Sequence, residues 1–180
     1  MKIKLYLDFD GVILNTIDVT YEMFKKNNEY DDINEFYKNL DWDYVLSISS
    51  PINDSINAIH KLVKSGLYDV HILTHFNTEK EARSKKRFDK KELDNVKLIT
   101  VIKGVNKCEV VDCENAVLVD DYMGNLVLWQ ANGGIPIKFS DKGKKYDIMS
   151  ISNLTELIDR YDEICSLVET NNKKLVNSKK

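Results

Sequence analysis

The chain has 180 residues, of which 43% are hydrophobic, and its formal net charge is −3. This length suits one ordinary domain with a real core, which excludes a wholly disordered chain. The acidic balance supplies no overall basic field for a nucleic-acid backbone or an anionic membrane. Three cysteines without disulfide-type spacing, no apolar run approaching about 20 residues and no signal-peptide segment predict a reduced, cytoplasmic protein that does not enter the membrane.

Strands and helices are predicted to alternate along the chain. Residues 3–9 form a strand with apolar side chains on both faces, as in the buried strands of a parallel sheet. Similar strands are predicted at residues 70–74, 96–102, 116–120 and 135–139. Helices at about residues 56–65 and 126–131 end at glycines, and a last helix begins at a capping signal, Asn153 followed by Glu156. This alternation predicts a doubly wound, Rossmann-like parallel α/β sheet.

Three segments fall outside the alternation. Residues 17–50 form an insert with apolar residues at helical spacing, which predicts two short helices too small to fold alone. We therefore expect an α/β core of residues 1–16 and 51–170 with a small helical cap between its two parts. Residues 79–92 mix basic and acidic residues, which favours a solvent-exposed helix face over a nucleic-acid-binding surface. Residues 171–180 are polar and predict a disordered tail.

Polar residues stand where several predicted strands end. Asp8 and Asp10 close the first strand, Thr74 closes the second, and Asp120 and Asp121 follow the strand at residues 116–120. Ligands of open α/β sheets bind outside the carboxyl ends of the strands, so these side chains are expected to meet. Four converging carboxylates repel one another unless a hard cation lies among them, and Mg²⁺ prefers oxygen ligands. The sequence therefore predicts a magnesium site.

These motifs resemble those of the haloacid dehalogenase (HAD) superfamily of phosphatases. The resemblance covers residues 2–16 and 51–139, and its four motifs arrive in the family's order: Asp8-Phe9-Asp10-Gly11-Val12, Thr74, Lys107 and Asp120-Asp121. Within the superfamily, the chain looks most similar to the 5′(3′)-deoxyribonucleotidase group. That finer resemblance is carried by Asn125-Leu126, Trp129 and Gly133-Gly134, although the insert of residues 17–50 is shorter than that group's helical cap.

The resemblance implies a role for each matched residue. Asp8 would attack phosphorus and form an aspartyl-phosphate, and Asp10 would act as general acid and then as general base. Thr74, His75 and Lys107 would bind the phosphoryl oxygens. Mg²⁺ is the implied cofactor, and the implied metal ligands are Asp8, Asp10 through its backbone carbonyl, Asp120 and Asp121.

The resemblance implies a magnesium-dependent phosphomonoesterase, similar to a 5′-nucleotidase, whose partner is a small phosphate ester such as a (deoxy)nucleoside monophosphate. Phe24, Trp42 and Tyr44 of the insert could stack on a base, or they could simply pack the insert onto the core. One alternative is a phosphatase for phosphorylated polynucleotide ends, which a short cap would leave room for. Another is a receiver-type regulatory domain, although the strand at residues 96–102 ends in lysine and glycine rather than in a phospho-accepting aspartate.

Two residue assignments have alternatives. Lys103 lies one turn before Lys107 and could bind the phosphate instead; the spacing favours Lys107. His71, His75, Cys108 and Cys113 could be imagined as zinc ligands, but their spacing matches no known ligand pattern.

Overall fold

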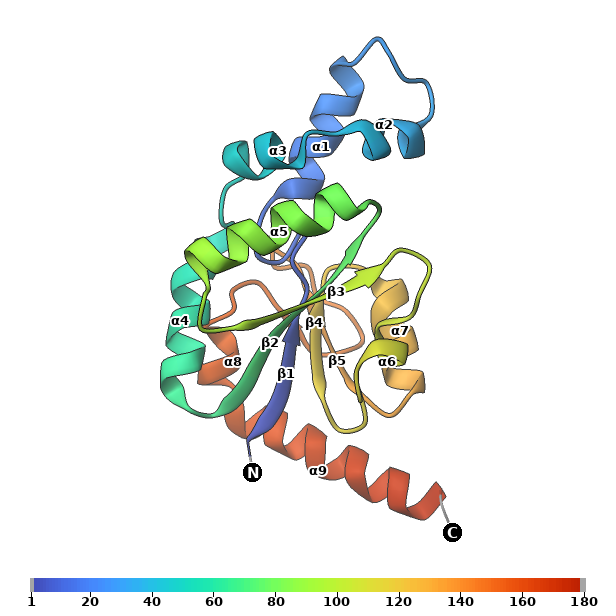
Figure 1. Ribbon diagram of the computed structural model, residues 1–180. Coiled ribbons are helices and arrows are strands. Elements are labelled where there is room, and N and C mark those ends of the chain that lie inside the picture. Colours follow the sequence, from blue (N-terminus) through green and yellow to red (C-terminus); the bar gives the residue numbers. More distant parts are fainter. Residues whose placement is uncertain (1, 179–180) are drawn as a thin grey trace.

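Six parallel strands form one sheet in the computed structural model, which describes residues 2–178 (Figure 1). The strand order is β3-β2-β1-β4-β5-β6. This confirms the predicted α/β fold and adds β6, which is too short to give a strand pattern in the sequence. The strands are β1 Ile3–Leu7, β2 Tyr68–Phe76, β3 Lys97–Ile102, β4 Val117–Asp120, β5 Ile135–Phe139 and β6 Ser150–Ile151.

The first strand lies inside the sheet, between β2 and β4. Leu5 is aligned with Val70 of β2 and with Val117 of β4. Leu5 and Leu7 are buried on one face of the sheet, and Tyr6 is buried on the other. Burial on both faces explains why apolar residues occur at odd and even positions of this strand. Because parallel strands end at the same edge of a sheet, the residues that follow β1 and β4 emerge side by side.

Helices cover both faces of the sheet. One face carries α4 (Ser55–Ser65), α5 (Glu79–Glu92), α8 (Glu156–Asp159) and α9 (Tyr161–Ser178), and the other carries α6 (Lys107–Val110) and α7 (Met123–Ala131). Gly66 follows α4 with φ +69°, so this helix ends at a left-handed glycine, as predicted. Within the part of the chain that the structure describes, no helix combines the length and apolar character needed to cross a membrane.

The insert contains three helices where two were predicted. They are α1 (Thr16–Lys26), α2 (Ile33–Asn39) and α3 (Trp42–Ile48). The two predicted helices correspond to α1 and α2, and α3 is a third that was not predicted. Asp41 caps this third helix by accepting hydrogen bonds from the backbone N–H groups of Asp43 and Tyr44. A small aromatic core around Phe36 and Trp42 holds the three helices together, beyond the carboxyl ends of the strands.

The two ends of the insert meet where it joins the α/β core. The backbone N–H of Asn15 donates to the carbonyl of Ser50 at 3.1 Å, and the Ser50 N–H donates to Asn15 Oδ1 at 2.7 Å. Leu14 and Pro51 form an isolated antiparallel bridge beside these bonds. The polypeptide therefore leaves the core and returns to it at a single place.

The prediction of a disordered tail over residues 171–180 is wrong for residues 171–178, which continue α9; residues 179 and 180 lie outside the described part. The Asn171 amide nitrogen donates to the carbonyl of Gly133 at 2.8 Å and to Asn115 Oδ1 at 3.0 Å. A polar residue thus anchors this stretch by hydrogen bonds, which a hydrophobic pattern does not reveal.

Helix α5 has a buried side as well as the solvent-exposed side that the sequence predicted. Its lysines and arginines are largely exposed, but Glu81, Ala82, Lys85 and Asp89 are buried against the core. Arg87, on the exposed side, holds both carboxylate oxygens of Asp43 in α3, at 2.7 and 2.6 Å. The helix therefore connects the sheet to the insert.

Replacing Asp89 by Asn is expected to stabilise the protein at pH 7. Asp89 Oδ1 is buried without a hydrogen-bond partner among the described residues, and burial, together with Asp94, raises the pKa of this carboxyl from 3.8 to about 6. A folded-state pKa above the unfolded value means that ionisation disfavours the native state as pH rises from about 4 to 6. Urea unfolding should show a gain of about 1 kcal/mol at pH 7, after allowance for solvent screening, and none near pH 3.5.

Candidate active site

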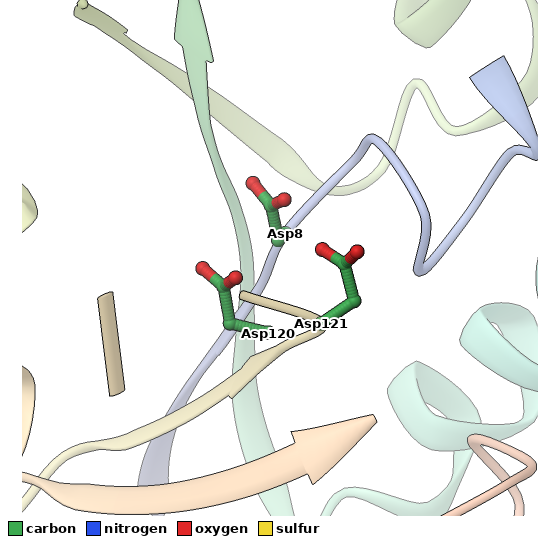
Figure 2. Close-up of side chains that lie close together, drawn as sticks. All are labelled: Asp8, Asp120 and Asp121. Carbon is green, nitrogen blue, oxygen red and sulfur yellow. The ribbon is translucent and has the colours of Figure 1, made fainter. Parts of the chain in front are cut away.

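Three carboxylates meet at the carboxyl edge of the sheet. Asp8 follows β1, Asp120 ends β4, and Asp121 is the next residue. Each side chain offers an oxygen that lies within 4.8 Å of an oxygen of the other two (Figure 2). Asp8 and Asp120 are buried, and Asp121 is partly exposed. The structure thus brings together residues that are more than 100 positions apart, as the strand-end argument predicted.

Gly11 allows the chain to turn against this cluster. Its φ is +74°, and a Cβ at this position would lie 2.6 Å from Asp121 Oδ2. Glycine is therefore required twice, once for the backbone conformation and once for the close approach. This explains why glycine follows directly after Asp10.

Lys107 lies between two of the acids. Its Nζ donates to Asp8 Oδ1 at 2.8 Å and to Asp120 Oδ2 at 2.6 Å, and the side chain is almost completely buried. Lys103 is exposed and has no such contact among the described residues. Of the two lysines considered from the sequence, the structure places Lys107 beside the predicted nucleophile.

The carboxylates still carry more negative charge than the lysine balances. Burial raises the pKa of Asp8, and the neighbouring Asp120 and Asp10 raise it further, while Lys107 acts in the opposite direction. Burial and Asp120 also raise the pKa of Asp121, to about 6, although the buried Lys138 acts in the opposite direction. A cation among these oxygens would relieve the repulsion, and an all-oxygen donor set suits Mg²⁺. The residues present therefore fit the predicted metal.

Asp10 points to a different set of partners. Thr16 donates its hydroxyl to Asp10 Oδ1 at 2.7 Å, and Lys85 donates to Asp10 Oδ2 at 2.5 Å. Thr74, which is fully buried, lies 3.4 Å from the same Oδ2. The Asp10 carboxylate is therefore held apart from the three-carboxylate cluster, and a metal contact through its backbone carbonyl stays a prediction.

Lys85 is the site residue that the sequence analysis missed. It was counted among the basic residues of a solvated helix, yet none of its surface is exposed. Burial opposes its charge, but Asp10 and Glu81 outweigh burial and raise the pKa of Lys85. Ala82, Lys85 and Asp89 share one helical face, and this spacing was the available signal. Because Lys85 and Asp89 are charged, this face did not look like a buried one in the sequence.

His75 lies at the edge of the site. Its Nε2 is 3.0 Å from the carbonyl of Val105, and burial lowers the pKa of the ring.

His71 lies in the middle of β2, with Nε2 3.0 Å from Asp69 Oδ2 and its ring stacked on Tyr6. Within residues 2–178, the carboxylates of Figure 2 form the one group of three or more clustered acidic, histidine or cysteine ligands.

A cavity of about 470 Å³ lies between the insert and the core. Tyr37 and Trp42 line it from the insert, and Asp10 lines it from the core. Of the aromatic residues proposed to stack on a substrate, Trp42 is at this cavity, Phe24 packs against Phe36, and Tyr44 is half-exposed. Phe24 is thus a packing residue of the insert. The further lining residues include Thr16, Thr20, His75, Asn77, Glu81, Lys103, Asn106, Tyr122 and Asn125.

The six-stranded parallel sheet with helices on both faces matches the α/β fold of solved structures that are named as HAD-superfamily hydrolases. No protein-family model matches the sequence, and no curated protein sequence matches it either. Solved structures do match, at identities that establish a shared fold.

Three of these structures illustrate the likeness. A HAD phosphatase from Thermococcus onnurineus has a TM-score of 0.58 and 20% identity, covering 88% of this chain and 97% of that one. A HAD-superfamily hydrolase of subfamily IA from Geobacter sulfurreducens has a TM-score of 0.60 and 13% identity, covering 88% and 95%. A D,D-heptose 1,7-bisphosphate phosphatase from Burkholderia thailandensis has a TM-score of 0.55 and 16% identity, covering 89% and 98%.

Proposed function

We propose that the protein is a magnesium-dependent phosphomonoesterase that hydrolyses a small phosphate ester through an aspartyl-phosphate. The observation that carries the proposal is the cluster of Asp8, Asp120 and Asp121 oxygens, with Lys107 bridging two of the acids. Neighbouring structures named as phosphatases support the same chemistry.

Mg²⁺ would be held by the cluster of Asp8, Asp120 and Asp121. When bound, it would neutralise phosphate charge so that an anionic nucleophile can approach an anionic ester. Asn125 Nδ2 donates to Asp120 Oδ2 at 2.9 Å, and the backbone N–H of Tyr122 donates to Asp120 Oδ1 at 2.8 Å. These bonds fix the orientation of the Asp120 carboxylate, which is the usual task of residues behind a metal ligand.

Asp8 would attack phosphorus, and the bond to the ester oxygen would break as the new phosphorus–oxygen bond forms. Asp10 would give a proton to the departing oxygen and later take one from the water that hydrolyses the aspartyl-phosphate. Lys107 is placed to balance charge on Asp8 and on the transferring group, and Thr74 and His75 would contact the remaining phosphoryl oxygens.

A (deoxy)nucleoside monophosphate is the substrate that we propose. Tyr37 and Trp42 line the cavity, and their rings are stacked at 6.4 Å between centroids; because Trp42 is nearly buried, Tyr37 is the ring available to a base. Aromatic side chains bind bases by stacking. The resemblance of Asn125 and Trp129 to the deoxyribonucleotidase pattern supports the same class. In this chain, Trp129 is buried and donates its Nε1–H to the Ala116 carbonyl, so its role is to stabilise the core.

The test is phosphate release from a panel of esters with Mg²⁺ present. The panel contains 5′- and 3′-deoxynucleoside monophosphates, sugar phosphates and oligonucleotides with a terminal phosphate. We expect release from mononucleotides and little from oligonucleotides, because Tyr37 and Trp42 of the insert form one wall of the cavity that Asp10 lines. Equal rates on oligonucleotides would favour the polynucleotide alternative. Absence of release from every ester, with the fold intact, would overturn the proposal.

A further inference from the structure

We propose that Lys85 is a positioning residue that fixes the Asp10 carboxyl group, which in its protonated form would give its proton to the leaving group. The inference rests on the proposed phosphatase function and extends it to a side chain outside the motifs that the sequence identified. Lys85 comes from the middle of α5, far from those motifs in sequence.

The contacts of Lys85 leave it little freedom. Its Nζ lies 2.5 Å from Asp10 Oδ2, 2.8 Å from Glu81 Oε1 and 2.8 Å from the carbonyl of His75. Thr74 Oγ1 is a fourth acceptor at 3.3 Å, so the three N–H donors of the ammonium group all have partners. The side chain is completely buried, and exchange with water does not compete with these bonds.

Both oxygens of Asp10 are anchored as a result. Thr16, at the start of the insert, holds Oδ1, and Lys85, on the core helix, holds Oδ2. Two anchors on opposite oxygens define one orientation of a carboxylate, at the wall of the cavity. General-acid catalysis depends on such placement of the proton donor.

Two of the buried lysines, Lys85 and Lys107, contact different acids of the site. Lys107 contacts Asp8 and Asp120, whereas Lys85 contacts Asp10 and Glu81. The predicted nucleophile and the predicted proton donor therefore have separate counter-charges. Removal of Lys85 would leave the Asp10 carboxylate with the hydroxyls of Thr16 and Thr74 and with no hydrogen bond from a cation among the described residues.

The experiment compares two leaving groups in the first half-reaction of Lys85→Met. An alkyl phosphate releases an alkoxide that needs a proton, whereas 4-nitrophenyl phosphate releases a phenolate that does not. With Mg²⁺ present and enzyme in excess, we expect alcohol release to slow about 100-fold and nitrophenolate release to slow by less than about 5-fold. Asp10→Asn should show the same discrimination, and adding Lys85→Met to it should change little further.

Three controls separate positioning from general damage. Lys86→Met changes an exposed lysine of the same helix and should leave both rates unchanged. Leu62→Ala removes a buried side chain of α4, and should lower stability without changing the ratio of the two rates. If Lys85→Met fails to fold, the double variant Lys85→Gln with Glu81→Gln replaces the ion pair by neutral amides, and it should still discriminate between the leaving groups.

Equal slowing of both leaving groups, or no slowing of either, would overturn the positioning role. The positioning role would also be overturned if adding Lys85→Met to Asp10→Asn slowed alcohol release by the same factor as Lys85→Met does alone. These outcomes require an active wild-type enzyme. Failure of the wild-type protein to release either leaving group would instead overturn the proposed function, so the two failures are distinguishable.

Discussion

Asp8→Asn is expected to abolish turnover of every phosphate ester that the wild-type protein hydrolyses. An amide cannot form the aspartyl-phosphate, and loss of a covalent nucleophile lowers kcat by about 10⁴-fold or more. The fold should survive, because the substitution removes one of the mutually repelling carboxylates around Lys107. Phosphate release under saturating ester, together with thermal unfolding, measures both parts of the prediction.

Asp112→Asn is the matched control for this variant. Asp112 is exposed, and its partner Lys4 lies in β1, so the pair sits away from the carboxyl edge of the sheet. Its loss should leave activity unchanged. An Asp8→Asn protein with wild-type turnover would show that Asp8 is not the nucleophile.

Removal of divalent metal is expected to have the second large effect. Dialysis against a chelator should abolish phosphate release, and Mg²⁺ should restore it. Because a ligand that binds only the folded state stabilises it, Mg²⁺ at 100 times its dissociation constant should raise the free energy of unfolding by about 2.7 kcal/mol. Thermal unfolding across a magnesium titration measures this rise without depending on activity.

Asp121→Asn provides the sharper version of the metal experiment. Asp121 is repelled by Asp120, so the variant without metal should be at least as stable as the wild type. It should nevertheless lose most of the stabilisation by Mg²⁺, because one oxygen donor has lost its charge. A variant that keeps the full magnesium-dependent rise would remove Asp121 from the metal site.

The parts of the fold that the sequence predicted are those with strong local patterns. Residues 3–9 are apolar on both faces because β1 is central, and Gly66 ends α4 because only glycine adopts its backbone conformation readily. The convergence of Asp8 with Asp120 followed from one rule about parallel strands. These features depend on sequence periodicity and chain direction alone.

The features that were missed depend on contacts made in three dimensions. Lys85 carries a charge, so its burial is visible only once Asp10 and Glu81 surround it. Asn171 anchors the last helix through hydrogen bonds to a distant loop, and Asp41 starts a helix that the helical spacing in the insert did not predict. Charged and amide groups can be buried when partnered, and a hydrophobic pattern cannot identify the partners.

The junction of Asn15 with Ser50 has a consequence for how such proteins diversify. Since the insert departs from and rejoins the core at neighbouring residues, a longer, shorter or unrelated segment could be exchanged there without moving β1 or α4. The acids and lysines that would perform the chemistry lie almost entirely outside that exchangeable segment. Selection could therefore change which molecule is admitted while leaving the reaction itself untouched.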